Sequence, residues 1–189
     1  MSINLHLNPR HNSVLNAAVI VFSRYGFERG TLADVAREAG LSRPLIYLLY
    51  PNKTALFVAL AQAMADDACA KCALAWPLER TFERGLATSA YVVSADAWRL
   101  MKESTHGFEI FALKNPLVGH INLGVDAFFI NLIKARLIRH HKSVSYASMI
   151  AAAVHGIKDK AISDDELMAN LASFAYVVTV GLGLSVSEN

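Results

Sequence analysis

The sequence has few charged residues and only two cysteines. Charged side chains make up 18% of the 189 residues, and the net charge of +2 does not by itself indicate a nucleic-acid partner. Cys69 and Cys72 are too few and too close together to crosslink a secreted fold. The first dozen residues are polar and lack the apolar core of a signal peptide. We therefore expect a cytoplasmic protein with reduced thiols.

Patterns typical of enzymes and metal sites are also missing. The sequence contains no Gly-x-Ser-x-Gly, P-loop or His-Glu-x-x-His motif, so it offers no catalytic constellation. Cys69-Ala-Lys-Cys72 has the spacing of redox and metal sites, but zinc needs four ligands and no second pair matches it. We expect no enzymatic activity, no metal and no cofactor, and we keep a thiol-redox sensor that uses Cys69 and Cys72 as an alternative.

One stretch near the C-terminus carries no formal charge and is long enough to cross a bilayer, namely residues 167–187. Acidic residues flank it, Asp164, Asp165 and Glu166 before it and Glu188 after it, and no lysine or arginine anchors it. A buried interface helix explains the stretch better than a membrane span does. We expect no membrane partner, and a membrane-associated protein is kept as a further alternative.

What the sequence does contain is helical periodicity along its length. Apolar residues recur at spacings of three and four, without convincing strand alternation or internal repeats. Glycine, proline and polar clusters divide the chain into about nine helices. We predict an all-α protein with a small three-helix module in residues 10–54 and a larger helical domain in residues 55–189.

The boundaries of the first two helices are marked by capping and stop residues. Residues 12–25 form the first predicted helix, and Gly26 stops it. Thr31 and Asp34 have the spacing of a capping box, in which each side chain accepts a hydrogen bond from the other residue's backbone N–H. A second, short helix therefore starts after Thr31 and ends at Gly40.

Two further helices follow. Ser42 is suited to cap a third helix over residues 43–50. Asn52 is suited to cap a long apolar helix that begins at Lys53 and ends before Pro77.

The second and third helices, joined by a tight turn at Gly40, have the spacing of a helix-turn-helix. In that motif the second helix enters the major groove of DNA. The charge distribution favours this prediction, because residues 1–53 hold six Lys and Arg against three Asp and Glu, whereas the remainder has a net charge of −1. An ordinary small helical bundle has similar caps, so the spacing alone leaves both interpretations open.

Helical spacing separates the two sides of the third helix. Ile46 and Leu49 can bury one side against the module. On the other side Arg43 can reach a guanine edge or a phosphate, and Leu45 or Leu48 can touch a thymine methyl group.

Phosphate contacts are predicted from hydroxyl groups and helix ends. Tyr47 and Tyr50 can offer hydroxyl groups to phosphates. Thr31 and Lys53 lie at two helix N-termini, where free backbone amides and the positive end of the helix dipole favour anions.

A dense set of residues between Val14 and Leu60 follows one known pattern. It comprises Phe22-x-x-Tyr25-Gly26-Phe27, Thr31-x-x-Asp34-Val35-Ala36-x-x-Ala39-Gly40-Leu41-Ser42, Ile46-Tyr47, Tyr50-Pro51-Asn52-Lys53 and Leu56. This segment, about a quarter of the chain, resembles the N-terminal domain of the tetracycline-repressor (TetR) family. The resemblance implies a homodimer whose recognition helices enter successive major grooves of a palindromic operator, and a C-terminal domain that binds an inducer. It assigns DNA contacts to Thr31, Ser42, Arg43, Pro44, Leu45, Tyr47 and Lys53.

The chain departs from that pattern at Leu48 and Leu49. Members of the family commonly carry polar, basic or aromatic residues at these two positions, often His or Tyr at the latter. Two leucines lower the expected number of phosphate contacts, so we expect the affinity for DNA to depend less steeply on salt.

The region between Leu78 and His140 mixes aromatic residues with scattered polar groups. Such a mixture can line an apolar pocket with a few orienting polar groups. Core packing explains any one of these residues more simply, so only the set as a whole supports a pocket. The candidate lining residues for an unidentified small apolar inducer are Trp98, Met101, His106, Phe108, Phe111 and Phe128.

The last two predicted helices, residues 145–160 and 164–184, are apolar on more than one face. A helix that is apolar all round must be buried on both sides, and pairing the two with their two-fold copies makes a four-helix bundle. The candidate interface residues are Met149, Ala153, Ile157, Leu171, Phe174 and Val178. The sequence thus predicts a homodimeric, ligand-responsive transcriptional regulator, most simply a repressor that an inducer releases from double-stranded operator DNA.

Overall fold

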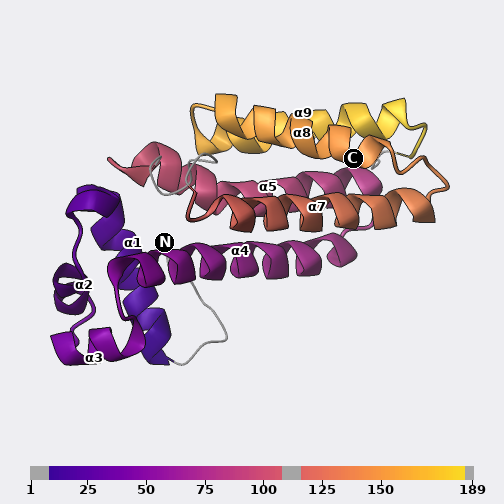
Figure 1. Ribbon diagram of the computed structural model, residues 1–189. Coiled ribbons are helices and arrows are strands. Elements are labelled where there is room, and N and C mark those ends of the chain that lie inside the picture. Colours follow the sequence, from indigo (N-terminus) through magenta and orange to yellow (C-terminus); the bar gives the residue numbers. More distant parts are fainter. Residues whose placement is uncertain (1–8, 108–115, 186–189) are drawn as a thin grey trace. The chain divides into compact units, whose positions relative to one another are not determined.

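In the computed structural model, residues 9–107 and 116–185 are described, and all their regular secondary structure is α-helix (Figure 1). The eight helices in these residues are α1 (Pro9–Arg29), α2 (Leu32–Glu38), α3 (Arg43–Leu49), α4 (Lys53–Leu78), α5 (Phe82–Glu103), α7 (Gly119–Arg139), α8 (Tyr146–Lys160) and α9 (Asp164–Gly181). The prediction of an all-α fold is confirmed.

The chain packs into two compact units. The first takes in the chain up to Asp67 together with Arg99–Leu123, and the second takes in Ala68–Trp98 and the chain from Gly124 onward. Helices α4, α5 and α7 each contribute residues to both units. This grouping is by packing, and the functional division into residues 10–54 and 55–189 stays a prediction.

Helix α1 supplies much of the core of the first unit. Its buried side chains, among them Val14, Leu15, Val21 and Phe22, follow the spacing of one helical face. The predicted stop at Gly26 is confirmed. Gly26 adopts non-helical angles, φ 77° and ψ 167°, that glycine tolerates, and after this kink a separate short helical turn continues to Arg29.

Three phenylalanines join α1 to α4 within the first unit. The rings of Phe22 and Phe57 are T-shaped at 5.8 Å, and Phe27 lies 4.7 Å from Phe57. Phe22 and Phe57 are both fully buried. Burial of these two side chains stabilises the fold by roughly 2–3 kcal/mol each, and the short helices α2 and α3 pack against the same core.

The ends of α4 show one confirmed and one corrected prediction. The Asn52 side-chain oxygen accepts a hydrogen bond from the Ala55 backbone N–H at 2.8 Å, which is the predicted cap. At the other end, α4 does not stop before Pro77 but runs to Leu78 with Pro77 inside it. Proline removes one backbone donor and crowds the preceding turn, and α4 ends one residue after it.

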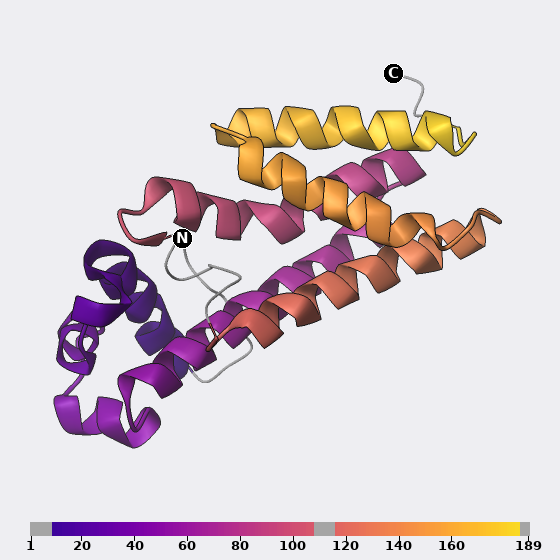
Figure 2. The ribbon, with the colours of Figure 1, turned by 45° about the horizontal axis from the view of Figure 1, so that its top comes forward.

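The second unit is built on its own apolar core. Its largest fully buried side chains come from α5, α7, α8 and α9, namely Leu86, Ile133, Leu137, Ile150 and Leu167. Helices α8 and α9 contact each other and lie side by side, as the orange and yellow ribbons show in both views (Figures 1 and 2). Ser163 begins α9 by accepting a hydrogen bond from the Glu166 backbone N–H at 3.1 Å.

Candidate nucleic-acid interface

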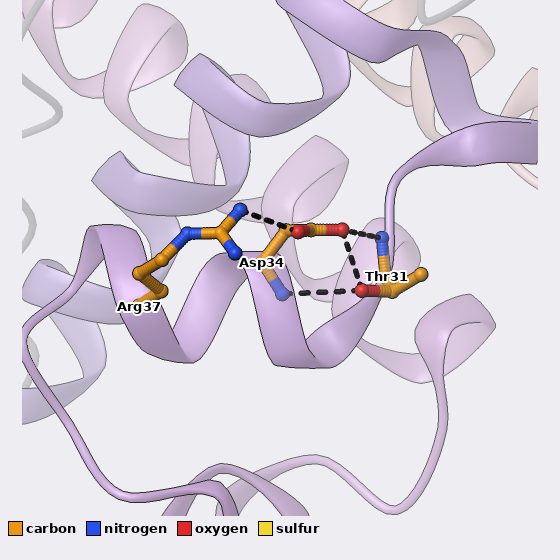
Figure 3. Close-up of polar contacts among 3 residues, drawn as sticks. All are labelled: Thr31, Asp34 and Arg37. Carbon is orange, nitrogen blue, oxygen red and sulfur yellow. Dashed lines mark hydrogen bonds and ion pairs between the residues drawn. The ribbon is translucent and has the colours of Figure 1, made fainter.

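The start of α2 is fixed by three residues whose side chains point toward one another (Figure 3). The Thr31 hydroxyl accepts from the Asp34 backbone N–H at 3.1 Å, and the Asp34 carboxylate accepts from the Thr31 backbone N–H at 3.1 Å. The predicted capping box is therefore confirmed. Arg37 adds an ion pair to Asp34 at 2.6 Å.

This cap affects the predicted role of Thr31. Its hydroxyl donates its single proton to the Asp34 carboxylate at 2.5 Å, and that hydrogen bond, with help from Arg37, lowers the pKa of Asp34 below its usual value. A carboxylate already lies at the helix end that was predicted to attract a phosphate. The assignment of Thr31 as a DNA contact stays a prediction.

We expect Thr31→Ala to lower the free energy of unfolding by about 1 kcal/mol, because it removes the side-chain cap of α2. Urea unfolding followed by circular dichroism at pH 7 measures this loss. Thr31→Ser keeps the hydroxyl and is the control. Because the pKa of Asp34 is lowered by folding, the contribution of the cap is full at pH 7 and is lost as the pH falls through that lowered pKa. Equal stability of all three proteins at pH 7 would contradict the role of the cap.

The turn between α2 and α3 is closed by backbone hydrogen bonds. Gly40 has φ 66°, and the Leu41 backbone N–H reaches back to the Ala36 carbonyl at 2.9 Å. This is the left-handed helix ending that glycine favours. Because α2 and α3 also contact each other, the turn fixes the direction in which α3 leaves it.

Helix α3 begins as predicted at Arg43, but its cap differs from the prediction. Ser42 occupies the cap position with extended backbone angles, yet its side chain makes no capping hydrogen bond. The Ser42 carbonyl instead accepts from the backbone N–H groups of Leu45 and Ile46, at 3.1 and 3.2 Å. Pro44 needs no partner for a missing N–H, so the first turn forms without a side-chain cap.

One face of α3 is exposed and the opposite face is buried. Ile46 is fully buried, and Leu45 and Leu49 are partly buried. The exposed side chains are those of Arg43, Pro44, Tyr47 and Leu48, and the fractional exposure is 55% for Tyr47 and 81% for Leu48. Spacings of three and four place these residues on one surface, which is the surface that a recognition helix presents to DNA.

Tyr50 does not belong to that surface, contrary to the prediction. It is 7% exposed, and its hydroxyl is hydrogen-bonded to His11 Nδ1 at 3.0 Å. Burial raises the pKa of Tyr50, and its ring meets the His11 ring edge-on. Tyr50 therefore ties the end of α3 to the first turn of α1 instead of offering a hydroxyl to a phosphate. No sequence signal marked His11, because it lies 39 residues from Tyr50.

Lys53 is held at the start of α4 by the segment that follows the Gly26 kink. Its ammonium donates to the Glu28 carbonyl at 2.9 Å and lies 4.6 Å from the centre of the Phe27 ring. An ammonium group carries three N–H donors, so this bond leaves capacity for a phosphate. These two contacts fix the position of the Lys53 ammonium. The sequence predicted the charge but neither contact.

The N-terminal residues match a known family. Residues 14–60 match the family described as bacterial regulatory proteins, tetR family. The match gives residues 14–60 of this chain as a TetR-family segment.

Curated relatives match a part of the chain. The chain is 35% identical over 66 residues to the uncharacterized HTH-type transcriptional regulator YfiR of Bacillus subtilis, a match that covers 35% of this chain and 32% of that protein. It is also 35% identical over 57 residues to an HTH-type transcriptional repressor of Mycobacterium tuberculosis, covering 30% of each. The chain thus spans about a third of the length of the curated relatives it matches.

A solved structure extends the similarity of fold over most of the chain. The transcriptional regulator FadR from Bacillus subtilis, solved in complex with stearoyl-CoA, aligns with a TM-score of 0.67. The alignment covers 89% of this chain and 97% of that chain at 17% sequence identity. At this identity the likeness shows that the fold is shared.

The residues predicted to line an inducer pocket are distributed between the two units. Met101 and His106 belong to the first unit, and Trp98 and Phe128 to the second. Trp98 is 3% exposed, and its indole N–H donates to the Ala161 carbonyl at 3.2 Å, so it serves the core of the second unit. Phe108 and Phe111 lie outside the described residues. The assignment of these residues to a pocket stays a prediction.

An open apolar groove of about 380 Å³ runs between α8 and α9. Four of the six predicted interface residues line it, namely Met149, Ala153, Phe174 and Val178. Sequence reasoning missed the other lining residues, which are Tyr146, Ile150, Val177, Gly181 and Leu182.

Leu171 corrects the interface prediction. It is 1% exposed and packs in the core of its own protomer, so it is not available to a partner. Ile157 is partly buried against the same core. The uncharged stretch after Glu166 signalled an apolar helix but not which of its sides faces outward.

The thiol alternative finds no support in the structure. Cys72 is fully buried, its thiol lies 3.7 Å from the Ser89 carbonyl, and burial raises its pKa to about 11. A reactive sensor thiol needs an accessible, low-pKa sulfur. Over residues 9–107 and 116–185, no group of His, Cys, Asp and Glu side chains has a geometry that would hold a metal ion.

Within the described part of the chain, no single helix is long and apolar enough to cross a bilayer. Helices α3 and α4 taken together have the length and apolar composition of a span, but the chain bends by 64° at the break between them.

Proposed function

We propose that this protein is a ligand-responsive transcriptional regulator, most simply a repressor, that binds double-stranded operator DNA through α3. The observation that carries this proposal is the exposed face of α3, with Arg43, Tyr47 and Leu48 on a helix whose other side is anchored by the buried Ile46. The match of residues 14–60 to a family of bacterial regulatory proteins supports it.

The dimensions of α3 suit the major groove. An α-helix with its side chains is about 10–12 Å in diameter, and the groove is about 12 Å wide. Arg43 supplies a fork of donors for a guanine edge or a phosphate, and Tyr47 a hydroxyl for a phosphate. Lys53, tethered by Glu28, supplies a positioned charge beside the helix.

The proposal includes a homodimer formed through α8 and α9. Both helices expose large apolar side chains, including Met149 at 63% and Val177 at 64%, and the groove between them is open. From Leu167 to Ser185 the sequence carries no charged side chain. Such a surface is stabilised by a second apolar surface, and a two-fold copy provides one.

The proposed inducer is a small, largely apolar molecule bound in the helical C-terminal region. FadR from Bacillus subtilis, which shares the fold, was solved in complex with stearoyl-CoA, and this supports a ligand with a large apolar part. An inducer that binds better to a conformation with altered spacing of the two recognition helices lowers the affinity for DNA, and DNA lowers the affinity for the inducer by the same factor.

Selection from a pool of random DNA duplexes with the full-length protein tests the proposed DNA binding. We expect enrichment of an inverted repeat whose half-sites lie about one helical turn, roughly 34 Å, apart, because a dimer presents two recognition helices. Arg43→Ala, which alters only an exposed side chain, is the matched control and should enrich the repeat weakly. A failure of the unaltered protein to enrich any sequence would refute the proposal.

A further inference from the structure

The exposed face of α3 is unusually poor in hydrogen-bonding groups. Leu48 is 81% exposed, as high a value as any leucine reaches in the described residues. Pro44, four residues earlier, is exposed and adjacent to it on the helix surface. Between residues 43 and 49 only Arg43 and Tyr47 carry side-chain donors, so part of the face can make only apolar contacts.

The chemistry of the major groove limits what such a surface can recognise. Guanine, cytosine and adenine present hydrogen-bond donors and acceptors there, and thymine adds the C5-methyl group, which is apolar. A leucine placed against a donor or acceptor would remove water from it without replacing the hydrogen bond, at a cost in affinity. A leucine placed against a methyl group buries apolar surface on both sides.

We propose that Leu48 reads the C5-methyl group of a thymine in each operator half-site. This inference rests on the proposed function, because it takes α3 to be the helix that enters the groove. Leu48 is favoured over Leu45 for this contact because Leu45 is partly buried against the protein. Leu48 is therefore a specificity-determining residue that selects thymine by shape and hydrophobic contact rather than by hydrogen bonding.

The neighbours of Leu48 favour DNA as the occupant of this surface. Arg43 and Tyr47 share the exposed face with it, and the chain through residue 53 carries twice as many basic as acidic residues. A basic surface attracts the phosphate backbone and positions the helix in the groove. Leu48 and its neighbour Pro44 thus form a small apolar area on a face that also carries Arg43 and Tyr47, which suits a methyl group in a polar groove.

The experiment replaces thymine by deoxyuridine, which pairs identically but lacks only the methyl group. The duplex enriched by selection is synthesised with deoxyuridine at one thymine position at a time, in both half-sites together. Fluorescence anisotropy measures the affinity of the full-length protein for each duplex. We expect one position at which the affinity falls about 15-fold, or about fourfold for each methyl group lost.

Two variants assign this loss to Leu48. Leu48→Ala should bind the thymine and deoxyuridine duplexes within about twofold of each other, because its side chain no longer reaches the methyl group. Leu48→Met keeps an apolar side chain of similar reach and should retain most of the discrimination. Because Leu48 is exposed, neither change is expected to alter the unfolding transition.

The outcomes separate this inference from the proposed function. Binding of the unaltered protein that is equal for thymine and deoxyuridine at every position overturns the reading of a methyl group and leaves DNA binding intact. An undiminished loss in Leu48→Ala overturns the assignment to Leu48. Absence of binding to any duplex overturns the proposed function itself.

Discussion

Tyr47→Ala is expected to weaken operator binding by about 100-fold. Tyr47 is 55% exposed on the face of α3 that carries Arg43 and Leu48, so its hydroxyl is free to donate to a phosphate oxygen. A hydrogen bond to a charged group contributes about 1.5–3 kcal/mol, which is tenfold or more for each half-site. A dimer loses this contact twice. Fluorescence anisotropy with the selected duplex measures the effect.

Two further variants identify which interaction is lost. Tyr47→Phe keeps the ring and removes the hydroxyl, so it should reproduce most of the loss if the phosphate contact dominates. Because tyrosine is neutral, Tyr47→Ala should leave the salt dependence of binding unchanged, whereas Lys53→Ala should reduce the slope by about 0.9 for each half-site. Unchanged affinity in both Tyr47→Ala and Lys53→Ala would contradict the assigned docking of α3.

Val177→Lys is expected to dissociate the homodimer and, through it, to abolish high-affinity operator binding. Val177 is 64% exposed in the protomer and lines the groove between α8 and α9, so the change leaves the core intact. In the proposed interface each new ammonium would be buried without a partner, at a cost of about 3 kcal/mol or more. The dimer dissociation constant should rise by more than about 100-fold. Sedimentation velocity over a range of concentrations measures it.

Ile138→Lys is the matched control for this experiment. Ile138 is 61% exposed, which is close to the value for Val177, but it lies on α7 and does not line the groove. It should leave both the mass of the particle and operator binding unchanged. A dimeric Val177→Lys protein with normal affinity for DNA would refute the assignment of this groove to the dimer interface.

The local features of the helix-turn-helix were predictable from sequence because they depend on near neighbours. The capping box of Thr31 and Asp34 and the cap at Asn52 are formed by residues three positions apart, and both are confirmed. The turn at Gly40 requires a positive φ that glycine adopts readily. The start of α3 also needed only local information, since Pro44 fits the first turn without a capping side chain.

The surroundings of the side chains proposed to bind DNA were less predictable. Spacing alone placed Tyr50 near the exposed face, but a partner 39 residues away, His11, holds its hydroxyl inside the protein. In the same way the position of the Lys53 ammonium depends on the Glu28 carbonyl, 25 residues earlier. Contacts between residues so far apart in sequence leave no periodic signal.

The sequence by itself determined that this protein is all-α, where helices α2, α3 and α4 begin, and which family its N-terminal residues match. These properties follow from capping, turn chemistry and the 3.6-residue period, which act within a few residues. Only the tertiary structure decided which apolar side chains face outward. Helix α9 is apolar on several faces, so its sequence did not separate the inward Leu171 from the outward Val177. The neighbours packed against each face made that choice, because burial depends on what the fold brings near.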